Sequence, residues 1–289
     1  MNLVHLANFN RLNLLGTGGA GQVYLVEYHD VKYAMKMIHT NSKRNLENAI
    51  RERDILLKLH HPFFPILYYS FQDDYYLYLI MSYCECGNFY HFMKKQVNQC
   101  FTKQQTTYYA SCLLVALEYL HFNGIIHRDL KPDNVLLSSD GHILLTDFNL
   151  SAIDQVHLKT FKLDDIHVVA EPNMIMHDQV GSRDYLAPEI VEHRPYTCMV
   201  DWWSYGIMIY EMLYGFTPFK NYQSIHECHL LFPCTKSHKC KNLIKSLLQH
   251  DPHQRLGFTG GAAEIKSHSF FHHVPFQLLN HQNPPIIPF

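Results

Sequence analysis

The sequence predicts an α+β protein with two lobes: a small β-rich lobe with one main helix, followed by a larger and mostly helical lobe. Two observations predict this class. Most of residues 1–81 form short β-type runs separated by turns, whereas beyond Cys86 the apolar residues recur at helical spacing. Hydrophobic residues make up 47% of the 289 residues and charged residues 17%, which supports a substantial core and excludes a disordered chain.

The elements of the first lobe follow from the spacing of its apolar residues. Residues 45–59 have helical character, because Ile50, Leu56 and Leu57 lie among charged residues at roughly helical spacing. The β-type runs are Leu12–Leu15, Gln22–Tyr28, Lys32–Ile38 and Leu77–Met81. We therefore expect this lobe to span residues 1–84, with a hinge near residues 82–87.

Two long helices are predicted in the second lobe, which we expect to span residues 85–273. In residues 106–121 the apolar positions include Ala110, Leu113 and Leu117, a helical rhythm. Residues 202–213 are apolar nearly all round, which is typical of a buried helix. Four prolines then make residues 274–289 look like an extended tail lying against the surface.

Composition narrows the functional classes. The formal net charge of -2 argues against nucleic acid as a partner. The eight cysteines contain no pair of CxxC units, and Cys84 with Cys86 is only a weak metal signal, so reduced thiols in an intracellular, cytoplasmic protein are favoured, with the nucleus as an alternative. Near Met1 there is no basic segment before an apolar run, and no run of about 18 apolar residues exists, so we expect neither a secretory signal nor a membrane span.

A glycine-rich string joins two of the β-type runs. Residues 16–23 read GTGGAGQV, in which Gly16, Gly18 and Gly21 would let the backbone lie close over phosphates, and Val23 follows them. Dinucleotide-binding folds use a similar string, but there the glycines lead into a helix, and here they lead into a strand. A plain hairpin turn is the alternative interpretation.

A lysine follows at the end of the next β-type run, where residues 33–36 read YAMK. Lys36 in that position would hold the α- and β-phosphates of a nucleotide, provided that a carboxylate fixes its direction. Glu52 in the predicted helix is the first candidate for that carboxylate, and Glu47 is a weaker one. A solvated surface lysine is the alternative.

The strongest signal is the string HRDLKPDN at residues 127–134. Asp129 could accept the proton of a substrate hydroxyl, Lys131 could neutralise a phosphoryl group in transfer, and Asn134 could ligate a metal ion. A carboxylate, a lysine and an amide this close together in a loop have no evident packing role. The string therefore favours a functional role over a structural one.

Two further strings complete the series. Residues 147–149 read DFN, and Asp147 would bind the magnesium ion that bridges the phosphates. Residues 187–189 read APE and close the segment that begins at Asp147. Glu189 is expected to pair with a buried arginine, for which Arg255 is the candidate.

These strings, in this order, resemble the eukaryotic protein kinases over about residues 9–273. Lys131 followed by Pro132 is similar to the serine/threonine branch. Residues 33–37 (YAMKM), residues 181–189 (GSRDYLAPE) and the aromatic and proline residues of the tail are similar to the AGC group. Within that group, residues 147–151 (DFNLS) and the long segment after them resemble the phototropin and fungal flippase-kinase branch most. The resemblance implies a bilobal protein-kinase fold, ATP and Mg²⁺ as cofactors, and transfer of the γ-phosphoryl group to serine or threonine in protein substrates.

The roles given above to the residues of these strings are those that the resemblance implies, and the resemblance assigns further residues as well. For ATP it implies that Met81 is the gatekeeper, that Ser82 and Cys84 offer backbone groups to adenine, and that the ring lies between Val23, Ala34 and Leu136. For the substrate it implies that Asp133 and Glu211 bind arginine upstream of the acceptor. Leu150 resembles enzymes that favour serine over threonine, and Ser182 favours a protein substrate.

The sequence also departs from the family pattern. Asn149 stands where the family has glycine, which would restrict flipping of the DFN segment while Asp147 keeps its metal. Asp178 aligns with the activation-loop phosphosite, so its carboxylate could pair with Arg128 without phosphorylation. The segment from Ser151 to His177 is long, and Thr160, Asp164 and Asp165 suggest a solvated insertion.

Several alternatives remain open. Because of Asn149, a nucleotide-binding scaffold without catalysis is the main rival, and a small-molecule kinase of similar fold is the second. The chain ends before the aromatic motif of most AGC tails, so either that regulation is absent or a partner supplies the motif. We expect a monomer that acts on protein substrates.

Overall fold

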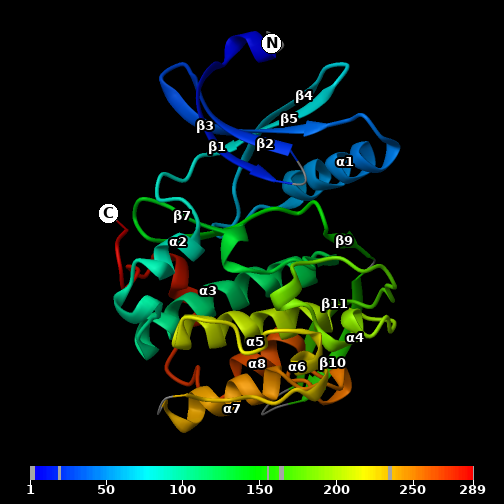
Figure 1. Ribbon diagram of the computed structural model, residues 1–289, viewed down its shortest axis with the longest axis vertical. Helices are drawn as coiled ribbons and strands as arrows, with labels where there is room; N and C mark the ends of the chain where they lie inside the picture. The colour runs from blue at the N-terminus through cyan, green and yellow to red at the C-terminus, as the bar shows by residue number, and fades with distance from the viewer. Residues whose placement is uncertain (1–3, 19–20, 155, 163–165, 234–235, 289) are drawn as a thin grey trace. The chain divides into compact units, whose positions relative to one another are not determined.

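The computed structural model describes residues 4–18, 21–154, 156–162, 166–233 and 236–288. The chain divides into two compact units, and each is described by itself (Figure 1). The first unit comprises Met1–Glu85 and Thr146–Asn149, and the second comprises Cys86–Leu145 and Leu150–Phe289. Among the described helices, none is both long and apolar enough to span a bilayer.

A five-stranded antiparallel sheet forms most of the first unit, with the strand order β1-β2-β3-β5-β4 (Figure 1). Its strands are β1 (Asn10–Gly18), β2 (Gly21–Tyr28), β3 (Val31–His39), β4 (Leu67–Gln72) and β5 (Tyr76–Ser82). The four predicted β-type runs all lie within strands. β4 was not predicted, because it is a short edge strand whose residues alternate between half-buried and exposed.

One helix accompanies this sheet, as predicted: α1, which spans Lys43–Lys58. Its N-cap is Ser42, whose hydroxyl accepts a hydrogen bond from the backbone N–H of Asn45. The buried face of α1 carries Ala49, Ile55 and Leu56, and among these apolar side chains lies Glu52. A carboxylate on an apolar helix face requires a cationic partner, and that partner is described below.

The second unit is built mainly of helices, which confirms the predicted α+β class. In Figure 1 the two longest helices of this unit, α3 and α5, run side by side. Every residue of α5 is buried, as the all-round apolar pattern predicted, while α3 begins with a capping box between Thr102 and Gln105. The α-helices are α2 (Phe89–Lys94), α3 (Lys103–Phe122), α4 (Pro188–Val191), α5 (Met199–Tyr214), α6 (Tyr222–Glu227), α7 (His238–Leu247) and α8 (Gly261–Lys266).

Short strands complete the second unit. β7 (Val135–Leu137) pairs with β8 (Ile143–Leu145), and β6 (Ile125–Ile126) pairs with β9 (Ala152–Ile153). The long segment after Ser151 contains an antiparallel hairpin of β10 (Val156–Lys162) and β11 (Ile166–Pro172), and β11 lies alongside α3 and α8. Of the three residues that suggested a solvated insertion, Asp164 and Asp165 lie outside the described residues.

The C-terminal segment differs from the expected extended tail. Phe276–His281 form a 3-10 helix, and within it the side chain of Leu279 is 1% exposed, whereas Leu278 is 54% exposed. Beyond this helix the segment crosses α3, where Tyr109 donates a hydrogen bond to the carbonyl of Ile286. The prolines correctly exclude an α-helix, but they do not prevent a short 3-10 turn that buries one leucine.

Candidate active-site groups in the two units

Lys36 is the centre of a buried ionic group in the first unit. Its Nζ donates to Glu52 Oε1 at 2.6 Å, to Glu52 Oε2 at 2.9 Å and to Asp147 Oδ1 at 2.8 Å. β3, α1 and the Thr146–Asn149 segment therefore each contribute one charged side chain. Glu47, the weaker candidate, instead lies 3.9 Å from Lys43 on the exposed side of α1.

The environment of Lys36 keeps it cationic. Burial acts to lower its pKa, because desolvation disfavours the ammonium. The carboxylates of Glu52 and Asp147 outweigh this effect, and the pKa of Lys36 is raised above its usual range. At neutral pH Lys36 is therefore an ammonium whose position is fixed by two carboxylates, and an ammonium is a charge-assisted donor that phosphate oxygens can accept from.

The DFN segment has one strained residue, and it is not the asparagine. Asp147 has a φ of 67°, whereas Asn149 is not among the described residues with positive φ. The Phe148 side chain is fully buried, with its ring centroid 6.1 Å from that of Phe64. Replacing glycine by asparagine at position 149 therefore imposes no left-handed strain in this conformation.

In the second unit, Asp129 is the centre of a hydrogen-bonded loop. Its Oδ2 accepts from Lys131 Nζ at 2.8 Å and from Asn134 Nδ2 at 3.0 Å, and its Oδ1 accepts from the backbone N–H of Ser182 at 2.8 Å. Lys131 also donates to Ser182 Oγ at 2.5 Å. The structure thus brings three of the sequence-predicted residues to the carboxylate of a fourth, Asp129.

A residue that the sequence analysis missed holds this loop in place. Asp201, fully buried in the first turn of α5, accepts from the backbone N–H groups of His127 at 2.9 Å and Arg128 at 2.8 Å. Arg128 has a φ of 67°, and these two hydrogen bonds to Asp201 stabilise this strained conformation. We call Asp201 the anchor of the loop. The available signal was an acidic residue at the start of an otherwise apolar helix.

His121 and the anchor carboxylate are also paired. His121 Nε2 lies 2.8 Å from Asp201 Oδ2. Burial acts to raise the pKa of Asp201, but the hydrogen bond to His121, the charges of His121 and His127 and the backbone N–H of Arg128 lower it below its usual range. Asp201 is therefore ionised at neutral pH despite being fully buried.

Arg128 and Asp178 form an ion pair. Arg128 Nη1 donates to Asp178 Oδ1 at 2.7 Å and to Oδ2 at 2.9 Å, while Arg128 Nε donates to the carbonyl of Leu150 at 2.6 Å. Tyr196 also donates to Asp178 Oδ1 at 2.8 Å. Burial acts to raise the pKa of Asp178, but Tyr196 and Arg128 outweigh it and lower the pKa.

The two acidic residues expected at the substrate have different surroundings. Asp133 is exposed, whereas Glu211 is 3% exposed and accepts a hydrogen bond from the hydroxyl of Tyr185. Burial raises the pKa of Glu211, the bond to Tyr185 and the charge of Lys94 oppose this rise, and the nearby Asp133 carboxylate adds to it. The hydroxyl of Tyr185 is a partner that sequence reasoning did not find.

The predicted pair of Glu189 and Arg255 is present, with Nη1 to Oε1 at 2.7 Å and Nη2 to Oε2 at 2.9 Å. Both side chains are buried. The pair connects the start of α4 to the segment that follows the 3-10 helix Pro252–Gln254. It is a structural bond within the second unit.

The glycines of the GTGGAGQV string have unequal roles. A Cβ on Gly21 would lie 1.9 Å from the carbonyl oxygen of Met37, and Gly21 has a φ of 142°. A Cβ on Gly16 or on Gly18 would meet nothing within 4 Å. Gly21 is thus required by the packing of β2 on β3. Packing does not require glycine at positions 16 and 18, where a side chain would meet open space.

The residues expected around adenine belong to both units. Val23 pairs with Lys36 between β2 and β3, and Ala34 pairs with Met81 between β3 and β5. The Ser82 hydroxyl accepts from the backbone N–H of Ile66 at 3.0 Å, and Cys84 is buried. The remaining residue, Leu136, is on β7 of the second unit. Their meeting around one nucleotide stays a prediction.

The fold and these groups agree with the comparisons to known proteins. Residues 9–271 match the family model described as the protein kinase domain, so the chain belongs to the protein kinase domain family and has its bilobal fold. The family implies ATP, generally with Mg²⁺, and protein substrates.

More particular similarities follow from single relatives. The chain is 39% identical over 97% of its length to flippase kinase 1 of Saccharomyces cerevisiae, of which the match covers 34%. It is 39% identical over 97% of its length to serine/threonine-protein kinase nrc-2 of Neurospora crassa, of which the match covers 50%. For serine/threonine-protein kinase RHS3 of Arabidopsis thaliana the identity is 37%, over 98% of the chain and 69% of the relative. The chain thus spans half or less of the first two relatives.

Proposed function

We propose that this chain is a serine/threonine protein kinase that transfers the γ-phosphoryl group of ATP to protein hydroxyls. The observation that carries the proposal is the Asp129 carboxylate, which Lys131, Asn134 and the Ser182 backbone hold by three hydrogen bonds. A carboxylate fixed in this way can accept a proton from an incoming hydroxyl. The neighbouring lysine supplies the positive charge that a phosphoryl group in transfer needs.

Nucleotide and magnesium would be held by groups from both units. Lys36, aimed by Glu52, supplies a charge-assisted donor to phosphate oxygens. Asn134 uses its Nδ2 to reach both the carbonyl and the carboxylate of Asp129, which leaves its amide oxygen as the donor atom for a metal. The resemblance assigns the Asp147 carboxylate to the same ion, and oxygen ligands of these two kinds suit Mg²⁺. The metal, when bound, offsets the negative charge of the phosphates.

Substrate preference follows from charge near the loop. Asp133 is exposed, and Glu211 adds a second acidic group close to it. These carboxylates favour substrates with arginine upstream of the acceptor. Because Glu211 is buried against Tyr185, binding through it requires arginine to replace the tyrosine hydroxyl, so Asp133 carries the larger part of the preference. Leu150 supports serine over threonine as the acceptor.

Regulation and context complete the proposal. The pair of Arg128 and Asp178 supports activity without an upstream kinase, since a carboxylate already occupies the phosphosite position. The enzyme works as an intracellular, cytoplasmic monomer, with the nucleus as the alternative compartment.

The test measures the transfer of radiolabelled phosphate from ATP, in the presence of Mg²⁺, to an array of peptides that contain serine or threonine. Wild type should label arginine-containing serine peptides, and Asp129→Ala should lower the rate by about 10³-fold or more. Asp74→Ala, which removes an exposed carboxylate in the first unit, should leave the rate unchanged. If wild type binds ATP but transfers no phosphate to any peptide, the chain is instead a nucleotide-binding scaffold and the proposal is wrong.

A further inference from the structure

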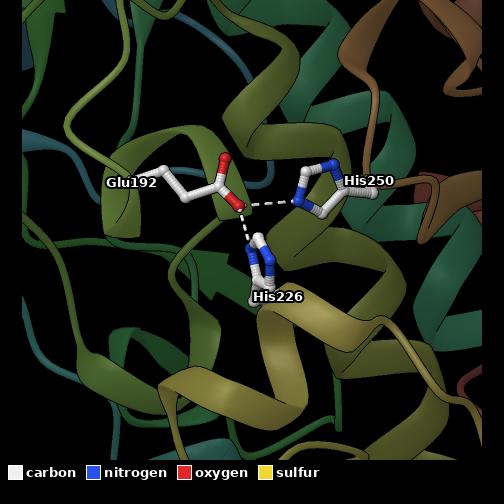
Figure 2. Close-up of side chains that lie close together, drawn as sticks. All are labelled: Glu192, His226 and His250. Carbon is white, nitrogen blue, oxygen red and sulfur yellow. Dashed lines mark hydrogen bonds and ion pairs between the residues drawn. The ribbon is translucent and has the colours of Figure 1, made fainter.

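Three side chains from separate segments of the second unit converge at a place remote in sequence from the loop of Asp129. Glu192 directly follows α4, His226 is on α6, and His250 follows α7 (Figure 2). Glu192 Oε1 lies 2.6 Å from His226 Nδ1 and 2.7 Å from His250 Nε2. The three ligand atoms all lie within 4.8 Å of one another.

The direction of the side chains is more specific than their proximity. Figure 2 shows both imidazole rings turned so that one nitrogen of each faces the same carboxylate oxygen. The other oxygen, Oε2, is held by Arg194 Nε at 2.7 Å. The arginine thus fixes the rotation of the carboxylate and leaves Oε1 for the histidines, in the way that outer partners orient metal ligands.

This donor set has the chemistry of a metal site. Two imidazoles with one carboxylate match the three protein ligands of zinc sites that keep one position for water. At zinc bond lengths near 2.0 Å, tetrahedral ligand atoms lie about 3.3 Å apart, so the N–O distances need to widen by about 0.6 Å. His226 is 68% exposed, so its ring can shift at little cost and leaves space for a water molecule.

We infer that Glu192, His226 and His250 form a binding site for a divalent transition-metal ion, with Zn²⁺ the best match. Imidazole nitrogen favours Zn²⁺ over Mg²⁺ and Ca²⁺, which prefer oxygen ligands only. The site is therefore chemically distinct from the magnesium site proposed at Asn134 and Asp147. It uses no residue of that site.

The bound ion would fasten three segments. Glu192 lies three residues beyond Glu189, which Arg255 already binds in a buried ion pair. Metal ligation would add α6 and the segment after α7 to this fixed point. Since the ion binds only when the three segments are folded together, it should stabilise the second unit in proportion to its concentration.

The experiment measures metal binding by the full chain after treatment with a chelator. Zn²⁺ is titrated by calorimetry, and Co²⁺ is added separately as a spectroscopic probe, because visible absorption is more intense for four-coordinate than for six-coordinate cobalt. Wild type should bind one tight equivalent of Zn²⁺ and give the four-coordinate Co²⁺ spectrum. With Zn²⁺ at about 100 times its Kd, the unfolding midpoint should rise by about 5 °C.

The chain has 22 histidines in all, and the variants separate the two in this site from the rest. His226→Ala and Glu192→Gln should each weaken the tight equivalent by about 100-fold and reduce the shift in midpoint to about 1 °C. His229→Ala is the matched control, because it removes an exposed histidine three residues from His226 and should bind as wild type does. Because His226 is exposed, its variant should fold even if Glu192→Gln does not.

Two results would overturn the inference. One is Zn²⁺ binding by wild type that is weak and spread over several sites, which would be adventitious histidine binding. The other is a tight equivalent that survives in His226→Ala. In either case the three side chains form a hydrogen-bonded cluster only.

Discussion

At the scale of single residues, the two units organise their charges by different means. In the first unit, Lys36 is charged because two carboxylates outweigh its burial. In the second, Asp201 is charged because a histidine and two backbone N–H groups surround it. The sequence could indicate Glu52 as the lysine partner but could not exclude Glu47, since both are in one helix and only the direction of the helix face decides between them.

Asp201 offers a test of the anchor. In wild type, both carboxylate oxygens of Asp201 accept hydrogen bonds from backbone N–H groups. In Asp201→Asn an NH₂ group replaces one of these oxygens, and because it cannot accept, at least one buried hydrogen bond is lost. We expect the unfolding free energy to fall by about 3 kcal/mol and peptide phosphorylation to be lost at temperatures where the variant is folded. Urea unfolding and the peptide assay measure these. Asp140→Asn, at a largely exposed turn, should change neither by much.

Asp178 offers a test that depends on pH. Its folded-state pKa lies below the ordinary value, so the folded state binds fewer protons and the ionised pair stabilises the fold at neutral pH. This contribution should be present above about pH 4 and be lost as pH falls through the folded pKa. We expect Asp178→Asn to lower the unfolding midpoint and the peptide rate at pH 7, and the gap in midpoint to narrow below about pH 4. Equal rates at pH 7 would contradict the proposed role.

At the scale of elements, the apolar period predicts the central strands and the long helices, and it fails where other forces act. β4 lies at the edge of its sheet, so half-burial dilutes its pattern. The β10–β11 hairpin forms in the segment whose polar residues suggested a solvated insertion. The 3-10 helix Phe276–His281 forms in the segment whose prolines suggested an extended tail. Short pieces of this kind are stabilised by contacts distant in sequence, which a local pattern does not contain.

The β1–β2 hairpin predicts a difference between two glycines of one string. Gly21→Ala places a methyl group against the carbonyl of Met37 and forces a φ that alanine rarely adopts, so we expect a loss of about 2 kcal/mol or more in unfolding free energy. Gly16→Ala meets open space and should leave the unfolding free energy within about 0.5 kcal/mol of wild type. Thermal unfolding of the two variants compares them directly. Equal losses would show that the Cβ contact is not the reason for Gly21.

At the scale of the whole molecule, the order of the motifs along the chain was the most informative signal. Each string is short, but five of them in sequence resemble one family, and the family model covers residues 9–271. The groups within each unit could be expected from that resemblance. Asp201, Tyr185 and the cluster around Glu192 could not, because their roles come from segments that only folding brings together.

The C-terminal segment is part of the fold of the second unit, and two adjacent leucines test this. Leu279→Ala removes a fully packed side chain, so we expect the unfolding free energy to fall by about 3 kcal/mol. Leu278→Ala removes a side chain that is 54% exposed and should cost less than about 1 kcal/mol. The two midpoints in thermal unfolding measure the difference. Identical midpoints would mean that this segment contributes nothing to the core.

The ion pair between Arg128 and Asp178 has a consequence for how the activity of this protein could be regulated. Both members are encoded in the gene, so the pair forms as soon as the chain folds, and no phosphatase can remove the negative charge. Enzymes that add or erase phosphate at this position have nothing to act on. Under the role proposed for Asp178, the pair itself would respond to acidity, because protonation of the Asp178 carboxylate removes its charge.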